Sequence, residues 1–216
     1  MTARFGLIVF DWDGTLMDSA AKIVNCFRQS FADVGLAAPD EEAIRQIIGL
    51  GLPEAVATLL PDTDTAARAA VTERYRRHFL ELDQTAMPMF PGVEAGLTRL
   101  TGAGYQLAIA TGKSRRGLDR ALAQSRTREF FTVSRCADEA FSKPHPRMLE
   151  DILEFTGMKS SEAIMVGDTT FDLQMARNAG MPGLAVTYGV HRRENLVNEQ
   201  PLACLNSFDE VLRWFA

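Results

Sequence analysis

The chain has 216 residues, of which 46% are hydrophobic and 24% charged, a composition typical of a soluble globular protein. Its net charge of −5 argues against a nucleic-acid partner, because binding to a phosphate backbone normally requires clustered lysine and arginine. No segment approaches the roughly 20 consecutive apolar residues that span a bilayer, so we expect no membrane partner either.

The first predicted element is a strand over residues 7–10, a short apolar run that ends at Asp11. A run of this length without alternation suits a strand that is buried on both faces of a sheet. Because residues 1–4 lead directly into this run and acidic residues follow it, we expect a buried strand here and no signal peptide. The three cysteines are widely spaced and odd in number, which is typical of reduced thiols and indicates a cytoplasmic protein.

Residues 18–87 contain no convincing strand and show helical periodicity instead. Apolar residues recur at helical spacing on two predicted faces: Ile23, Phe27, Phe31 and Val34, and then Val71, Tyr75, Phe79 and Leu82. We therefore predict an all-α cap domain over residues 17–87, inserted after the first strand. Residues 1–16 and 88–216 would form the core domain.

A glycine-flanked break lies inside this insert at Gly49, Leu50 and Gly51. A mobile loop there could close over a site and read the non-phosphate part of a substrate. A plain turn between two helices would explain the same residues, and the sequence leaves both interpretations open.

Short apolar runs of strand length recur after the insert, and helix-patterned sequence follows them. They cover residues 106–110, 130–133, 163–166 and 184–187. This alternation predicts an α/β fold, with a Rossmann-like parallel sheet at its core and helices on both faces of that sheet.

Polar residues stand where the predicted strands end. They are Asp11 and Asp13 after the first strand, Thr111 after the second, Lys143 in a later loop, and Asp168 and Asp172 after the run at 163–166. Because ligands bind at the carboxyl ends of parallel strands, we expect these side chains to meet in one crevice. Four carboxylates there need more counter-charge than one lysine supplies. Oxygen-only ligands favour Mg²⁺ over zinc, so the sequence predicts a magnesium site.

The spacing of Asp11 and Asp13 lets both side chains face the same side of an extended chain. A carboxylate at Asp11 can attack a phosphoryl group, and water can then hydrolyse the aspartyl phosphate. A second carboxylate at Asp13 can protonate the leaving alkoxide and afterwards deprotonate that water. Backbone N–H groups at Gly14 can hold phosphate oxygens. The Thr111 hydroxyl and the Lys143 ammonium can contact the phosphate as well.

Four further polar residues flank these groups. Asp18 and Ser19 could cap the first helix of the insert or steady the hinge that leads into it, and we expect a structural role for them. Lys113 and Ser114 should lie in the first turn of the helix after the second strand. Contact with phosphate or substrate and an ordinary helix start explain this second pair equally well.

Four segments, in this order along the chain, resemble the motifs of the haloacid dehalogenase-like hydrolase superfamily. They are Asp11-Trp12-Asp13-Gly14-Thr15-Leu16, Ala110-Thr111-Gly112-Lys113-Ser114, Ser142-Lys143-Pro144-His145-Pro146 and Val166-Gly167-Asp168-Thr169-Thr170-Phe171-Asp172. Together with the helical insert, the resemblance covers essentially the whole chain. The insert is similar to the cap of the phosphoglycolate phosphatase-like subgroup.

This resemblance implies that Asp11 is a nucleophile and metal ligand and that Asp13 is an acid/base. It implies Mg²⁺ bound by Asp11, by the backbone carbonyl of Asp13 and by Asp168, with Asp172 as a further ligand or as a support behind the ligands. Phosphate would be bound by Gly14, Thr111, Gly112 and Lys143. The implied activity is Mg²⁺-dependent hydrolysis of a small phosphomonoester, phosphoglycolate-like or a sugar phosphate, by a monomer or homodimer.

Two alternatives stay open from the sequence. A phosphomutase of the β-phosphoglucomutase type would form the same aspartyl phosphate and return it to a second sugar hydroxyl, and no residue pattern separates it from a phosphatase. A phosphate-accepting signalling receiver-like domain also combines acidic residues, a threonine and a lysine around Mg²⁺. Such a domain is shorter and has no helical insert, so it fits this chain poorly.

Overall fold

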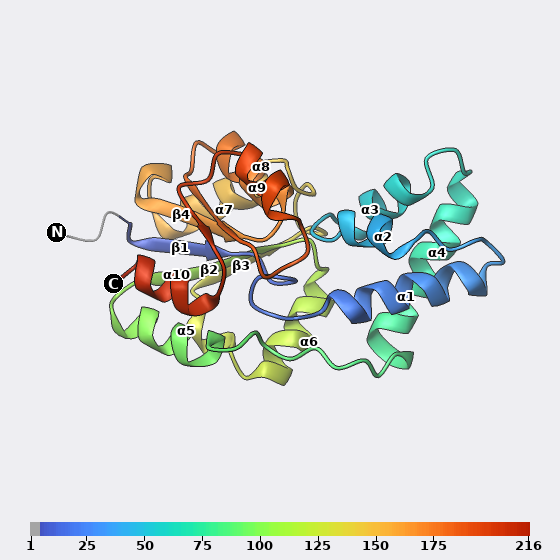
Figure 1. Ribbon diagram of the computed structural model, residues 1–216, viewed down its shortest axis with the longest axis horizontal. Coiled ribbons are helices and arrows are strands. Elements are labelled where there is room, and N and C mark those ends of the chain that lie inside the picture. The colour runs from blue at the N-terminus through green and yellow to red at the C-terminus, as the bar shows by residue number, and fades with distance from the viewer. Residues whose placement is uncertain (1–4) are drawn as a thin grey trace.

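The computed structural model describes residues 5–216, so the prediction that residues 1–4 are no signal peptide lies outside the described residues. Residues 5–216 form a six-stranded parallel sheet with helices on both faces and a further group of helices at one end of the strands (Figure 1). The predicted Rossmann-like α/β fold is confirmed. Within the described residues, no helix is long and apolar enough to cross a membrane.

The strands are β1 (Leu7–Phe10), β2 (Gln106–Thr111), β3 (Val133–Cys136), β4 (Ala163–Gly167), β5 (Gly183–Val186) and β6 (Cys204–Leu205). Their order in the sheet is β3-β2-β1-β4-β5-β6. The first strand of the chain thus lies at the centre, and Leu7 pairs with Gln106 on one side and with Ala163 on the other. This position puts the residues that follow β1 between the ends of β2 and β4.

Two strand predictions differ from the structure. The bounds of the candidate strand at residues 130–133 are wrong, because the short turn η2 (Arg128–Phe130) occupies its start and β3 begins only at Val133. The two phenylalanines in that run pack against the core from outside the sheet, which explains their apolar character without strand pairing. The strand β6 was not predicted, because two half-buried residues carry too little pattern.

Alternate residues of each central strand face opposite layers of core. Leu7 and Val9 pack with helices α7 (Arg147–Thr156) and α8 (Thr170–Asn178). Ile8 and Phe10 pack on the other face. The helices of that second layer are α5 (Val93–Gly102), α6 (Arg115–Ser125) and α10 (Phe208–Trp214). Burial on both faces explains why the strands read as continuous apolar runs.

The remaining helices of the core are short. The turn η3 (Ser160–Glu162) leads into β4, and α9 (Arg193–Asn198) covers the outer part of the sheet, where Leu196 packs against Leu173 and Ala185.

Helices between β1 and β2 form a separate group, which we call the helical segment (residues 20–82). They are α1 (Ala20–Asp33), α2 (Glu41–Gln46), α3 (Leu52–Leu59), α4 (Thr65–Arg77) and the π-helical turn η1 (His78–Leu82). Their apolar faces meet in a hydrophobic cluster distinct from the two layers on the sheet. The side chains of Asp40 and Asp64 accept hydrogen bonds from backbone N–H groups and fix where α2 and α4 begin.

The predicted faces of these helices are largely correct. Phe27, Phe31 and Val71 are buried in the cluster, as their helical spacing predicts. The exception is Leu82, which is 48% exposed because it lies at the end of the π-helical turn, where the helical period no longer holds.

Two chain crossings connect the helical segment to the sheet. Met17 forms an isolated antiparallel bridge with Met89, and Asp18 N–H donates to the Pro88 carbonyl at 2.8 Å. The chain therefore enters and leaves the helical segment at one place.

Removing a side chain from the central sheet should be costly. Leu107 on β2 is fully buried, so Leu107→Ala should lower the free energy of unfolding by about 2–5 kcal/mol through lost burial and a residual cavity. Leu202, which is 50% exposed, provides the control, and Leu202→Ala should change stability by less than about 0.5 kcal/mol. Urea titration measures both, and equal effects would contradict the assignment of the core.

Candidate active site

The carboxyl ends of the central strands carry the polar groups expected there. Asp11 follows β1, Thr111 is the last residue of β2 and Asp168 follows β4. The Asp11 N–H donates to the Val166 carbonyl at 2.9 Å, so the two central strands still run together where the acids begin. In this strand order the connections change direction between β1 and β4, the position at which open α/β sheets bind ligands.

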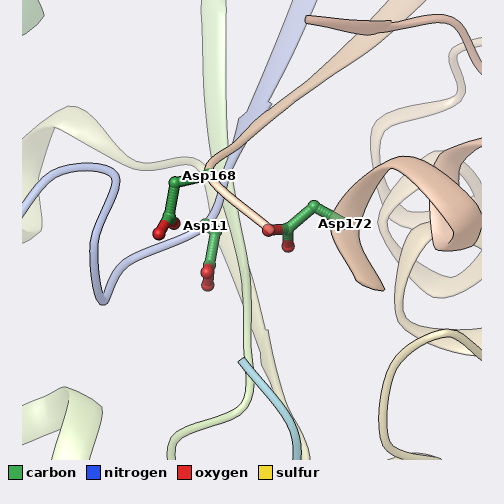
Figure 2. Close-up of side chains that lie close together, drawn as sticks. All are labelled: Asp11, Asp168 and Asp172. Carbon is green, nitrogen blue, oxygen red and sulfur yellow. The ribbon is translucent and has the colours of Figure 1, made fainter. Parts of the chain in front are cut away.

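Three carboxylates converge at this point (Figure 2). One oxygen from each of Asp11, Asp168 and Asp172 lies within 4.8 Å of the others, and all three side chains are buried. Neither carboxylate oxygen of Asp11 accepts a hydrogen bond of normal geometry from residues 5–216. Orphaned carboxylate oxygens in a buried acidic cluster fit a hard divalent cation such as Mg²⁺.

Among residues 5–216, one buried ammonium group faces this cluster. Lys143 Nζ lies 2.7 Å from Asp11 Oδ1 and donates a hydrogen bond to Asp172 Oδ1 at 2.6 Å. Burial by itself would lower the pKa of Lys143, but the charges of these two acids outweigh it and raise that pKa above its usual value. Lys143 therefore stays charged, and three carboxylates with one ammonium retain excess negative charge.

Burial and the excess negative charge together raise the pKa values of two of the acids. Burial raises the pKa of Asp11 well above its ordinary value, and the attraction of Lys143 only partly opposes it. Burial and repulsion from Asp172 raise the pKa of Asp168 to about 7. A cation bound between these carboxylates would stabilise their charged forms and reverse both shifts.

Asp168 is held from two sides. Its Oδ1 accepts a hydrogen bond from Thr15 Oγ1 at 2.8 Å, and its Oδ2 accepts one from the Val190 N–H at 2.8 Å. Gly14 lies against the same carboxylate, because a Cβ there would be 2.1 Å from Asp168 Oδ2, and its φ of +83° favours glycine.

The Gly14 N–H already has a partner within the chain. This group donates to the Met17 carbonyl at 2.9 Å, because the chain turns back on itself after Asp13. The conformation described here therefore does not offer it to phosphate, and the visible reason for a glycine is close approach to Asp168.

Asp172 lies at the start of α8 and is fully engaged. Its Oδ2 accepts hydrogen bonds from the N–H and the Oγ1 of Thr169, at 3.0 and 2.6 Å, in a capping box. Its Oδ1 accepts the bond from Lys143. Asp172 thus fixes the lysine ammonium against Asp11.

The loop at Gly49, Leu50 and Gly51 lies directly on the sheet edge. A Cβ on Gly112 would be 2.5 Å from the carbonyl oxygens of Gly49 and Leu50, so only glycine allows this approach. The Gly51 N–H donates to Ser142 Oγ at 2.8 Å. The helical segment therefore contacts the polypeptide immediately after β2 and immediately before Lys143.

A cavity of about 630 Å³ opens beside the acids, between the core and the helical segment. Asp11, Asp13 and Gly112 line its inner end. Gly49 and Leu50 line it from the loop, whereas Gly51 does not. Thr111 is fully buried beneath it, and its Oγ1 accepts a hydrogen bond from the Lys113 N–H at 3.2 Å.

Asp13 has two partners that sequence reasoning did not pair with it. Ser19 Oγ donates to its Oδ1 at 2.5 Å, and Lys113 Nζ donates to the same oxygen at 2.8 Å. The side chain of Ser19 does not cap α1, because its hydroxyl donates to Asp13 instead. The one available signal was that Lys113 closely follows Thr111 at a strand end.

Comparisons with known proteins identify the family of this chain. The sequence model of the family described as haloacid dehalogenase-like hydrolase matches residues 8–186. The probable phosphatase IndB of Dickeya dadantii is 38% identical over 211 residues, which cover 95% of this chain and 91% of that protein. A phosphoglycolate phosphatase of Mesorhizobium japonicum is 33% identical over 211 residues, covering 95% and 92%. A haloacid dehalogenase-like family hydrolase from Streptococcus pneumoniae superimposes over all of both chains with a TM-score of 0.87 and 28% identity.

The raised pKa of Asp168 predicts an inverted pH dependence of stability without metal. Native Asp168 keeps its proton up to about pH 7, whereas the unfolded chain loses it near its ordinary value of 3.8. Between these two values the native state binds one more proton than the unfolded chain. The contribution of Asp168 to the wild type's free energy of unfolding therefore decreases as pH rises from about 5 to about 7. Asp168→Asn should remove this contribution, roughly 1 kcal/mol per pH unit, in urea titrations with EDTA.

The substitution suits the local hydrogen bonds. The amide oxygen can accept from the Val190 N–H, and the amide NH₂ can donate to Thr15 Oγ1. Asp62→Asn, at an exposed acid, should parallel the wild type across the same pH range. If the curve of Asp168→Asn also ran parallel to that of the wild type, the raised pKa of Asp168 would be contradicted. Mg²⁺ should stabilise the wild type more than this variant.

Proposed function

The chain belongs to the haloacid dehalogenase-like hydrolase family and is a phosphatase, and on that premise we propose that it hydrolyses a small phosphomonoester through a phosphorylated Asp11. The observation that carries this proposal is the Asp11 carboxylate, which accepts no hydrogen bond of normal geometry from residues 5–216 and forms an ion pair of 2.7 Å with the Lys143 ammonium. Family membership leaves the receiver-like alternative without support. Relatives named phosphoglycolate phosphatase favour a phosphoglycolate-like substrate, with a sugar phosphate as the other class.

In the first half of the reaction, an Asp11 oxygen attacks phosphorus as the bond from phosphorus to the leaving oxygen breaks. Asp13 gives its proton to that leaving oxygen, so an alcohol departs. Lys143 opposes the charge on Asp11 and the phosphoryl oxygens, and Asp172 holds the lysine there. Thr111 and Gly112 complete the phosphate site at the end of β2.

In the second half, Asp13 accepts a proton from water as the water oxygen attacks the phosphorus of the aspartyl phosphate. The bond from phosphorus to Asp11 breaks, and inorganic phosphate leaves. Mg²⁺, held by Asp11, the Asp13 carbonyl and Asp168, would neutralise phosphoryl charge when bound. Asp172 supports this site from behind, because its oxygens are already occupied.

We propose that residues 17–87, which contain the helical segment, form a cap over this site. Its loop at Gly49 and Leu50 lines the cavity beside the acids, where it would contact the non-phosphate part of a substrate. The three cysteines are free thiols, which favours a cytoplasmic location.

Replacing the nucleophile should abolish turnover. Asp11→Asn keeps the shape of the side chain but removes the attacking carboxylate, so phosphate release should fall by at least about a thousandfold. The assay uses phosphoglycolate and several sugar phosphates, each with Mg²⁺ and with EDTA, and EDTA should suppress the wild type. Asp18→Asn, at an exposed acid near the same strand, is the matched control and should retain activity.

Undiminished phosphate release by Asp11→Asn would contradict the aspartyl-phosphate mechanism. A wild type that releases no phosphate from any ester but isomerises a sugar phosphate would favour the phosphomutase.

A methyl group at Gly112 should disturb the proposed cap. Gly112→Ala places a Cβ where the Gly49 and Leu50 carbonyl oxygens lie, so the loop must move away from the site. We expect kcat/KM to fall about tenfold to a hundredfold, with the fold retained. Gly102→Ala, in a helix where a Cβ meets nothing within 4 Å, should leave kcat/KM unchanged. Unchanged kinetics in Gly112→Ala would contradict a role for this contact.

A further inference from the structure

The Asp13 carboxylate is held entirely through one of its two oxygens. Ser19 Oγ and Lys113 Nζ both donate to Oδ1, at 2.5 and 2.8 Å. Among residues 5–216, no donor is directed at Oδ2, and Asp13 lines the cavity. Two donors on one oxygen fix the rotation of the carboxylate and leave the other oxygen free to exchange a proton with a ligand.

Lys113 is itself held by the helical segment. Its side chain is buried, and its ammonium lies 4.5 Å from the centroid of the Phe79 ring, a cation–π contact. Phe79 belongs to η1, where it stacks on Tyr75 at 5.7 Å and also receives Lys22 at 5.4 Å. The stacking on Tyr75 therefore holds the ring in place within the helical segment.

We propose that Lys113 is a positioning residue for Asp13, and that Phe79 keeps Lys113 in position whenever the helical segment lies on the core. This inference rests on the proposed phosphatase function and adds two residues to it. The ammonium already serves the Asp13 carboxylate and the Phe79 ring, so its first role is to orient the acid, ahead of contacting substrate.

The consequence is specific to one proton transfer. When the Asp11 oxygen bonds to phosphorus and the leaving oxygen departs, a basic alkoxide needs the proton from Asp13, whereas p-nitrophenolate is stable as an anion and needs none. Misplacing Asp13 should therefore slow esters of alcohols and spare esters of nitrophenol. Loss of folding or of phosphate binding would slow both alike.

The test compares kcat/KM for benzyl phosphate and p-nitrophenyl phosphate, whose organic groups are similar in size and carry no charge in the intact ester. This parameter covers only the steps through phosphoryl transfer to Asp11, so hydrolysis of the aspartyl phosphate does not enter. Lys113→Met should lower the value for benzyl phosphate about tenfold to a hundredfold and that for p-nitrophenyl phosphate less than about threefold. Lys113→Arg should restore most of the loss.

Matched variants separate positioning from packing. Phe79→Leu should give a smaller loss with the same preference, whereas Phe31→Leu, in the buried cluster of the same helices, should leave the ratio of the two substrates unchanged. Lys22→Met removes the other ammonium on the Phe79 ring and should leave the ratio near that of the wild type. In an Asp13→Asn background, Lys113→Met should have no further effect on the ratio.

Each outcome bears on one claim. Equal losses on both substrates in Lys113→Met, or an equal change of ratio in Lys22→Met, would overturn the positioning role and leave the phosphatase proposal intact. Hydrolysis of p-nitrophenyl phosphate alone by the wild type would also overturn it, since Asp13 would then protonate no leaving group. A wild type inert on both esters and on the wider panel would remove the proposed function itself.

Discussion

The burial of three neighbouring carboxylates, those of Asp11, Asp168 and Asp172, is the constraint on which the rest of this molecule depends. Burial, together with repulsion among the acids, raises the pKa values of Asp11 and Asp168, and the one ammonium on Lys143 only partly opposes these effects. Such a cluster persists only where other interactions hold its members in place. Here the two apolar layers on the central strands supply that rigidity, while Thr15, Thr169 and backbone groups fix the individual carboxylates.

The parallel sheet converts this cluster into a site. Because β1 lies between β2 and β4, the residues after each of these strands meet without any irregular backbone in the core. That geometry explains why the fold class and the convergence of Asp11, Lys143 and Asp168 could be predicted from the sequence. A residue that follows a continuous apolar strand has its position set by strand order, whichever loops connect the strands.

Contacts made by loops and by the helical segment could not be predicted in the same way. The bond from Lys113 to Asp13 joins residues that lie 100 positions apart in the chain. Ser19 could equally have capped α1. The Gly14 N–H donates to the Met17 carbonyl in a turn that no sequence pattern predicts. Periodicity identifies which face of an element is buried, but it carries no information on side-chain partners across a gap between two groups of helices.

The adjacent crossings at Met17 and Met89 have an evolutionary consequence. Because the chain leaves and rejoins the sheet at neighbouring points, the helical segment is a long insertion at one place in an otherwise continuous core. A change in the sequence or length of that insertion leaves the strand order and the buried acids unchanged. Sequence changes within the helical segment can therefore accumulate without moving the buried acids, provided that the loop at Gly49 and Leu50 still fits against Gly112.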